Sequence, residues 1–170
     1  MKVLITGSPG TGKTSVVNEL SAKGYAAFGP EDMGINKYFD SAAKKFVSRP
    51  APPIDHARYW SSWDIPKLKD LLASRKLVFI ADHNSMQPRY YDLFDKIIVL
   101  TADNDTLRYR LLHRDSNPND YGKHPDELKH VMSYNSGLAK KLLEAPGAVE
   151  VDASKLLSEV VDEILSVVKD

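Results

Sequence analysis

The sequence predicts an α/β fold, a parallel sheet of five strands with helices on both faces. Short apolar runs, typical of buried strands, alternate with longer segments whose apolar residues recur every three or four positions, typical of amphipathic helices. Strands that alternate with helices in this way form parallel sheets with helical crossovers. The 170 residues contain no internal repeat, so we expect one domain, 1–170, with its own hydrophobic core.

Five strands are expected from short apolar runs with breakers beside them. The first ends at Gly7, and the second is closed by Gly29 and Pro30, because glycine and proline interrupt regular pairing. The third and fourth runs are continuously apolar, as expected of strands that are buried on both faces. The five predicted strands are 2–6, 25–28, 77–81, 96–100 and 149–151.

Five helices are expected where apolar residues share one face, as Val16 and Leu20 do in the first. Asp103 or Thr101 is the expected N-cap of the third helix. Pro125 and the two acidic residues after it favour the start of the fourth. The predicted helices are 13–22, 64–74, 103–113, 125–143 and 156–168.

Composition excludes several kinds of protein. The chain has 23 basic and 23 acidic residues, and a net charge of zero argues against diffuse binding to nucleic acid or to an anionic membrane. The absence of cysteine removes disulfides, thiolate nucleophiles and cysteine-based zinc sites, and it suits a cytoplasmic protein. The apolar runs are too short to span a bilayer, and we expect no secretory signal at the start.

Residues 7–14 read Gly-Ser-Pro-Gly-Thr-Gly-Lys-Thr and fit the phosphate-loop pattern G-x-x-x-x-G-K-[ST] between a strand and a helix. In such a loop, backbone N–H groups and the helix N-terminus surround the phosphates. Lys13 is expected to reach the β- and γ-phosphates of ATP, and the Thr14 hydroxyl to bind Mg²⁺. The alternative is a glycine-rich turn without a ligand. The predicted nucleotide-binding residues here are Gly7, Ser8, Pro9, Gly10, Thr11, Gly12, Lys13, Thr14 and Ser15.

Acidic residues at the ends of two predicted strands are candidates for the chemistry. Asp82 directly follows the third strand, at the sheet edge where ligands bind, and is expected to hold the Mg²⁺ shell. The alternative is an aspartate that caps a turn. His83 is a proton relay or a polar surface residue. Asp32 orients or deprotonates the acceptor hydroxyl, or it ends a turn.

With these residues in place, the chain resembles the adenylate-kinase and shikimate-kinase branch of the P-loop kinases. It is most similar to the small nuclear-type adenylate kinases. Residues 7–14 resemble their phosphate loop, and 94–100 resemble the strand before their lid helix. Residues 107–114 match the pattern L-x-x-R-L-x-x-R, and 151–154 resemble the closing turn beside the adenine. The resemblance implies the three-layer P-loop NTPase fold, with the sheet order 2-3-1-4-5.

The resemblance also implies two roles for arginine. Arg110 would pack on adenine and Arg114 would face phosphate, while Ala153 and Ser154 would lie beside the base. The two arginines are four positions apart and share a helix face, where a guanidinium can stack on a base or bind phosphate. The alternative is a solvated basic face together with Arg108.

Two segments depart from the regular pattern. We expect 114–125 to form a short lid that closes with Arg114 and Lys123, because no arginine follows. Residues 35–63 are expected to be an acceptor-side insertion.

Within this insertion, Arg49 and Arg58 would hold a phosphate or carboxylate of the acceptor. Trp60 and Trp63 would stack on a base. Alternatively, Trp60 and Trp63 pack in the core, since they and Tyr59 have helical spacing.

Together these features predict a Mg²⁺-dependent kinase that moves the ATP γ-phosphate to a nucleoside monophosphate or another small acceptor. Lys13, Arg114 and Asp32 are the expected catalytic residues. The alternative is a slow ATPase or nucleotide-dependent binding protein that needs no acceptor. A GTP-dependent switch is disfavoured, because residues 101–105 lack the guanine-reading pattern Asn-Lys-x-Asp. ATP and the acceptor are the only expected partners, with neither nucleic acid nor membrane among them.

Overall fold

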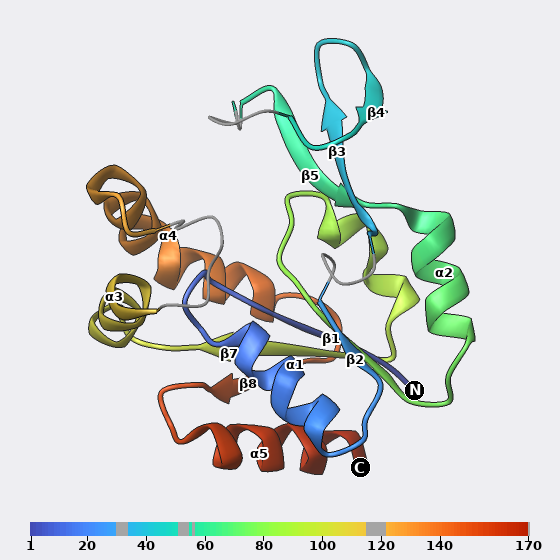
Figure 1. Ribbon diagram of the computed structural model, residues 1–170, viewed down its shortest axis with the longest axis vertical. Coiled ribbons are helices and arrows are strands. Elements are labelled where there is room, and N and C mark those ends of the chain that lie inside the picture. Colours follow the sequence, from blue (N-terminus) through green and yellow to red (C-terminus); the bar gives the residue numbers. More distant parts are fainter. Residues whose placement is uncertain (30–33, 51–54, 56, 115–121, 170) are drawn as a thin grey trace.

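A five-stranded parallel sheet forms the centre of the computed structural model (Figure 1). The structure describes residues 1–29, 34–50, 55, 57–114 and 122–169. If the five strands of this sheet alone are numbered one to five in chain order, their spatial order is 2-3-1-4-5, as predicted. Its strands lie in the order β2 (Ala27–Phe28), β6 (Val78–Ala81), β1 (Lys2–Gly7), β7 (Lys96–Thr101) and β8 (Ala148–Asp152).

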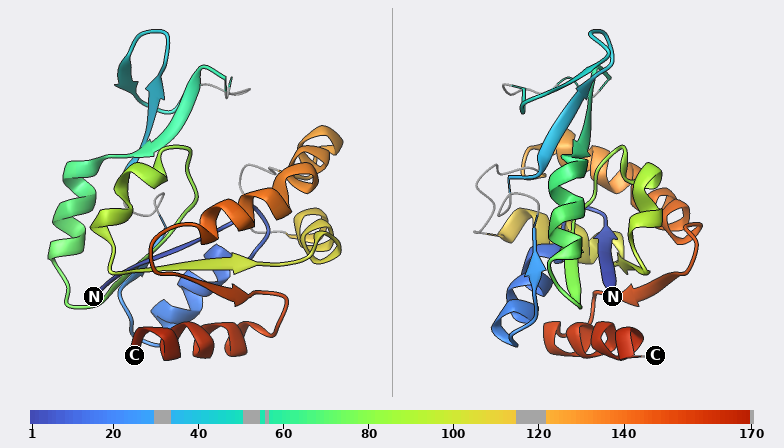
Figure 2. Two further views of the ribbon diagram at one scale, coloured as in Figure 1. Left: turned by 180° about the vertical axis from the view of Figure 1, so that it is seen from behind. Right: turned by 90° about the vertical axis from the view of Figure 1, so that its right-hand side faces the viewer.

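Helices cover both faces of the sheet, because successive residues of its strands point to opposite sides. In β1, Val3 and Ile5 face α1 (Lys13–Ala22) and α5 (Leu157–Lys169), whereas Leu4 faces the other side (Figures 1 and 2). Three helices contribute to the core on that second side. They are α2 (Ile65–Ala73), the 3₁₀ helix η1 (Gln87–Leu93) and α4 (Pro125–Leu143).

The third α-helix packs at the end of the sheet rather than over it. Helix α3 (Asn104–His113) contacts α4 through Leu111, which lies against Leu128 and Val131. Asp103 caps α3, as predicted: its Oδ1 accepts a hydrogen bond from the backbone N–H of Thr106 at 2.7 Å. The predicted helix ends agree with the structure to within one residue.

A second sheet occupies the segment that was expected to be irregular. Strands β3 (Asn36–Asp40), β4 (Lys45–Val47) and β5 (Tyr59–Trp63) pair antiparallel in the order β4-β3-β5 and stand away from the main sheet (Figures 1 and 2). The helical interpretation of the aromatic residues at 59–63 is therefore wrong. Trp60 and Trp63 lie on opposite faces of a strand, and the first is 38% exposed while the second is 1% exposed.

The described helices include none with the length and hydropathy needed to cross a membrane. The predicted lid, 114–125, falls mostly on residues 115–121, which lie outside the described residues.

Candidate active site

The phosphate loop has the conformation that its glycines permit. Gly7 has a φ of 151°, and a Cβ atom there would lie 2.4 Å from the carbonyl oxygen of Leu100, so only glycine fits. Gly12 has a φ of 93° and is the N-cap of α1. The loop thus carries the chain from the end of β1 to the first turn of α1, where backbone N–H groups are available to an anion.

Lys13 is folded back onto its own loop. Its Nζ donates hydrogen bonds to the carbonyl oxygens of Gly7 at 2.7 Å and Ser8 at 3.0 Å. Burial lowers the pKa of Lys13 to about 8; the negative charge of Asp82 opposes this, and the positive charge of Arg114 adds to it. Lys13, Asp82 and Arg114 are therefore close enough to interact, which brings three of the predicted residues together.

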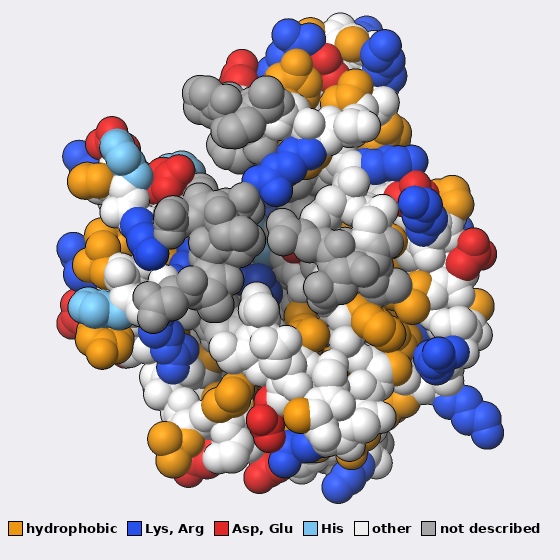
Figure 3. Space-filling model, viewed as in Figure 1, with side chains coloured by type: hydrophobic (Ala, Val, Ile, Leu, Met, Phe, Trp, Pro, Cys, Tyr) orange, Lys and Arg blue, Asp and Glu red, His pale blue; other side chains and the backbone are white. Residues whose placement is uncertain are grey.

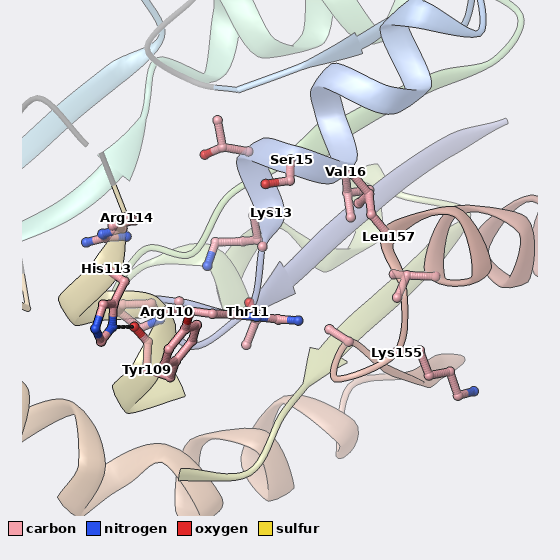
Figure 4. A pocket seen from close by; sticks show the side chains of 16 residues that line it. Thr11, Lys13, Ser15, Val16, Tyr109, Arg110, His113, Arg114, Lys155 and Leu157 are labelled. Atoms are coloured by element: carbon pink, nitrogen blue, oxygen red, sulfur yellow. Dashed lines mark hydrogen bonds between the residues drawn. The ribbon is translucent and has the colours of Figure 1, made fainter. Parts of the chain in front are cut away.

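A cavity of about 650 Å³ lies beside the loop, and Figure 4 shows the side chains that line it. Its walls come from the phosphate loop, from α3 and from the turn between β8 and α5. The lining residues include ten that were predicted: Pro9, Gly10, Thr11, Gly12, Lys13, Thr14, Ser15, Arg110, Arg114 and Ala153.

Two lining residues on α3 were not predicted. The rings of Tyr109 and His113 stack with centroids 4.4 Å apart and 23° between their planes, and Nδ1 of His113 is 2.8 Å from the Tyr109 carbonyl oxygen (Figure 4). Helical spacing places them on the same side as Arg110 and Arg114, and this signal was present in the sequence.

Ser154, predicted as a nucleotide contact, is not among the residues that line the cavity, and that contact stays a prediction. Its backbone N–H and hydroxyl both donate to Oδ1 of Asp152, at 2.9 and 2.6 Å. The hydroxyl thus closes the turn after β8, while its neighbour Lys155 lines the cavity.

Asp82 begins the loop after β6, and its carboxylate is held by side chains from two directions. Oδ2 accepts hydrogen bonds from Nε1 of Trp63 at 2.7 Å and from Nδ2 of Asn84 at 3.2 Å. Burial raises the pKa of Asp82, an effect that the donors and the charge of Lys13 oppose. A partly buried carboxylate of this kind favours a nearby cation.

The donors around the loop fit a magnesium ion. Thr14 is one of the residues that line the cavity, and Asp82 interacts electrostatically with Lys13 of the same loop. Among the described residues, no group of three or more His, Asp or Glu side chains forms a complete metal cage. Mg²⁺ commonly takes one or two protein oxygens and completes its shell with phosphate and water, so the sparse donor set suits it.

Two buried polar contacts support the loop, and neither was predicted. The Ser8 hydroxyl donates to Oδ1 of Asn135 on α4 at 2.6 Å, and Nδ2 of Asn135 donates to the carbonyl of Ala102 and to Oδ1 of Asn104, both at 3.0 Å. On the other side, Gln87 exchanges hydrogen bonds with the hydroxyl of Thr6. These partners are 81 and 127 residues apart in sequence, so no local pattern indicates them.

His83 does not have the properties of a proton relay near neutral pH. Burial and the charge of Lys13 lower its pKa to about 4, so the imidazole is neutral. Its Nδ1 is buried without a hydrogen-bond partner within the described part of the chain.

The predicted acceptor-binding residues do not line the cavity of the phosphate loop. Arg58 instead holds Asp40 in a bidentate ion pair, with Nε to Oδ1 at 3.0 Å and Nη2 to Oδ2 at 2.7 Å. This pair joins the ends of β3 and β5, and it lowers the pKa of Asp40 to about 2. Arg58 therefore supports the second sheet, and its contact with the acceptor stays a prediction.

Trp60 and Arg49 are exposed on the second sheet. Trp60 packs at 6.0 Å against Phe39, which in turn contacts Phe46 at 5.4 Å, so an aromatic row crosses the three strands. Figure 3 shows hydrophobic and basic side chains together at the tip of this sheet. Arg49 follows β4 and is also exposed. Asp32, the predicted base, lies outside the described residues.

Comparison with known proteins extends this description. A family profile for AAA domains matches residues 3–130. No curated protein matches the sequence. The structure is similar to that of a gluconokinase from Sinorhizobium meliloti 1021, with 17% identity and a TM-score of 0.61 over 99% of this chain and 91% of the other.

Two further kinases are similar over nearly their whole length. A shikimate kinase from Bacteroides thetaiotaomicron has 15% identity and a TM-score of 0.60, covering 100% of this chain and 99% of the other. A deoxyadenosine kinase from M. mycoides with bound dATP has 14% identity and a TM-score of 0.54, with 100% of both chains covered. The predicted resemblance to P-loop kinases is thus confirmed for the fold. The narrower resemblance to nuclear-type adenylate kinases stays a prediction.

Proposed function

The chain belongs to the AAA domain family, and we propose that it binds ATP with Mg²⁺ and moves the γ-phosphate to a small acceptor. One observation carries this proposal. The phosphate loop, with Lys13 in reach of the Asp82 carboxylate, shares a single cavity with Arg110 and Arg114 of α3. Cations from the phosphate loop and from α3 around one cavity suit phosphoryl transfer, in which positioning and charge neutralisation provide most of the catalysis.

Each side chain has a distinct part in this proposal. Lys13 leaves the carbonyls of its loop and binds the β- and γ-phosphates, while Arg114 approaches the γ-phosphate from α3. Arg110 stacks on the base, beside Ala153. Thr14 and Asp82 would hold the shell of a Mg²⁺ ion, which would supply charge neutralisation at the phosphates.

The acceptor is proposed to enter between the second sheet and the phosphate loop. The similar structures are named for kinases of gluconate, shikimate and deoxyadenosine, so this fold accommodates hydroxy acids as well as nucleosides. We keep Trp60 and Arg49 as candidate contacts to a nucleoside monophosphate or a small hydroxylated metabolite, and Asp32 as the candidate base.

A second function has an observation in its favour. Arg58 is committed to Asp40, so the second sheet offers one fewer guanidinium to an anionic acceptor than predicted. A nucleotide-dependent ATPase or binding protein would need no such group, and its exposed aromatic row would contact a protein instead.

ATP consumption with Mg²⁺ distinguishes the two functions. It is measured with and without a panel of nucleoside monophosphates, sugar acids and other hydroxylated metabolites. Lys13→Ala serves as the blank, and Lys23→Ala is the matched control because Lys23 pairs with Glu19 on the surface of the protein. A large rise with one acceptor class, lost in Lys13→Ala, establishes the kinase. A slow rate that no acceptor changes favours the ATPase, and equal rates in all three proteins contradict both functions.

A further inference from the structure

We infer that Trp63 is a positioning residue for the Asp82 carboxylate. Its indole N–H holds the oxygen of Asp82 in the orientation that the magnesium site requires. The inference rests on the proposed function, because that function assigns Asp82 to the Mg²⁺ shell. The contact itself is direct: Nε1 of Trp63 donates to Oδ2 of Asp82 at 2.7 Å. An indole has a single N–H donor, and this one is used entirely on the carboxylate.

The indole has a fixed position. Trp63 is 1% exposed, and its ring packs between Tyr90 at 6.2 Å and Phe94 at 5.9 Å. Its backbone pairs with Asn36 at the end of β5. A buried aromatic ring that is held on both sides and by its backbone cannot follow a carboxylate that rotates, so Trp63 sets the orientation of Asp82 rather than the reverse.

A second donor acts on the same atom. Nδ2 of Asn84 reaches Oδ2 of Asp82 at 3.2 Å, while Oδ1 of Asn84 accepts the backbone N–H of Met86 at 3.1 Å, which fixes the amide. Two immobile donors on one oxygen determine the plane of the carboxylate. Outer-sphere hydrogen bonds of this kind orient metal ligands and commonly contribute 10–100-fold to metal affinity or activity.

The contact also joins the two sheets. Trp63 belongs to the second sheet, whereas Asp82 follows β6 of the main sheet. The hydroxyl of Ser61, two residues earlier on β5, accepts a hydrogen bond from the backbone N–H of Ser85 at 3.0 Å. The acceptor-side sheet is therefore attached to the loop of Asp82 through Ser61 and Trp63, and of these contacts only that of Trp63 reaches the carboxylate.

Trp63→Phe tests the inference, because phenylalanine keeps an aromatic ring in the core and removes the N–H. Binding of ADP is measured by calorimetry at several Mg²⁺ concentrations and in EDTA, so the readout does not depend on turnover. We expect the apparent Mg²⁺ affinity of the nucleotide complex to fall about tenfold, as outer-sphere losses do. ADP binding in EDTA stays at the wild-type value. Asn84→Ala gives a smaller loss of the same kind.

Tyr90→Leu is the control for packing, because it removes a ring beside Trp63 and leaves the N–H in place. If Trp63→Phe keeps the wild-type Mg²⁺ dependence of ADP binding, the inference is wrong. It is also wrong if Trp63→Phe and Tyr90→Leu lose the same ADP affinity, and lose it in Mg²⁺ as much as in EDTA. If the wild-type protein binds ADP equally well in Mg²⁺ and EDTA, the metal site of the proposed function is wrong as well. The wild-type titration therefore distinguishes failure of the proposed metal site from failure of the role of Trp63 alone.

Fluorescence gives a measurement that does not rely on a variant of Trp63. The chain has two tryptophans, so Trp60→Phe leaves Trp63 as the only indole. Adding Mg²⁺ to the ADP complex of that variant is expected to shift the emission of Trp63, and EDTA is expected to reverse the shift. Emission that does not respond to Mg²⁺, in a complex that calorimetry shows to bind it, contradicts the inference.

Discussion

The Lys13 ammonium group donates hydrogen bonds to the carbonyls of Gly7 and Ser8, and its pKa is lowered to about 8, mainly by burial. A triphosphate favours the charged lysine and would raise this pKa in the complex. By linkage, the nucleotide affinity is highest below pH 8, where Lys13 is already protonated. Above pH 8 the affinity falls, because Lys13 of the free protein must take up a proton when the nucleotide binds. We expect the affinity to fall up to about tenfold per pH unit above 8.

Titration of the nucleotide at pH 7.0, 8.0 and 9.0 measures this effect. Lys13→Met provides the comparison, since it has no proton to lose and its weaker binding is expected to be flat over the same range. A wild-type affinity that is equally flat would show that Lys13 does not contact the phosphates, or that it is fully charged throughout.

Single residues of the site differ in how far the sequence predicts them. Lys13 and Thr14 were predictable because the phosphate loop is continuous in the chain and its chemistry depends on local spacing. Trp63 was interpreted as packing or base stacking, and its bond to Asp82 depends on how β5 lies against the β6 loop. No residue pattern encodes that arrangement. Arg58 was assigned by its charge alone, and the partner that occupies it, Asp40, is 18 residues away.

Among the elements, α4 contributes more to the site than its amphipathic pattern indicates. Asn135 lies on the buried stripe that contains Leu128, Val131 and Leu142, and it is 6% exposed. A buried amide on such a stripe is stable only if it is hydrogen-bonded, and the Asn135 side chain makes three hydrogen bonds, one of them to Ser8.

Asn135→Leu should therefore destabilise the protein although it adds apolar surface. It leaves the Ser8 hydroxyl and the Ala102 carbonyl without their partner, and we expect a loss on the order of 2–4 kcal/mol in the free energy of unfolding. Denaturant unfolding measures it. Ser133→Ala is the matched control, because that hydroxyl bonds to the carbonyl of His130 on the exposed side of α4.

A double-mutant cycle with Ser8→Ala shows whether the cost belongs to the contact between α4 and the phosphate loop. If the two losses are additive, the contact contributes nothing of its own. If Asn135→Leu is as stable as Ser133→Ala, the buried network is not a stabilising feature.

The second sheet shows where prediction of elements from sequence is weakest. Its strands are short, of five, three and five residues, and a short run does not distinguish helical from alternating spacing. Its stability depends on cross-strand pairs such as Phe39 with Trp60 and on the Asp40–Arg58 ion pair. The main helices have 9 to 19 residues, and their predicted ends agree with the structure to within one residue.

At the scale of the whole molecule, two apolar clusters enclose the main sheet, one on each face. This arrangement was predictable because buried parallel strands are continuously apolar, and the sheet order followed from the resemblance to P-loop kinases. The cavity combines β1–α1, α3 and the turn after β8, segments that adjoin only in the folded chain. These segments meet at the carboxyl edge of the sheet, the edge at which ligands bind in open parallel sheets.

A nucleotide that bridges these three segments should stabilise the entire fold. At a free concentration one hundred times its dissociation constant, a ligand that binds only the folded state adds about 2.7 kcal/mol. For a domain of this size, that corresponds to a rise in Tm of roughly 5–10 °C. Thermal unfolding with ADP and Mg²⁺ measures it, at the same ligand concentrations for wild type, Lys13→Ala and Lys23→Ala. We expect the rise in wild type and Lys23→Ala and a much smaller one in Lys13→Ala. An equal rise in all three would mean that the nucleotide binds outside the cavity of the phosphate loop.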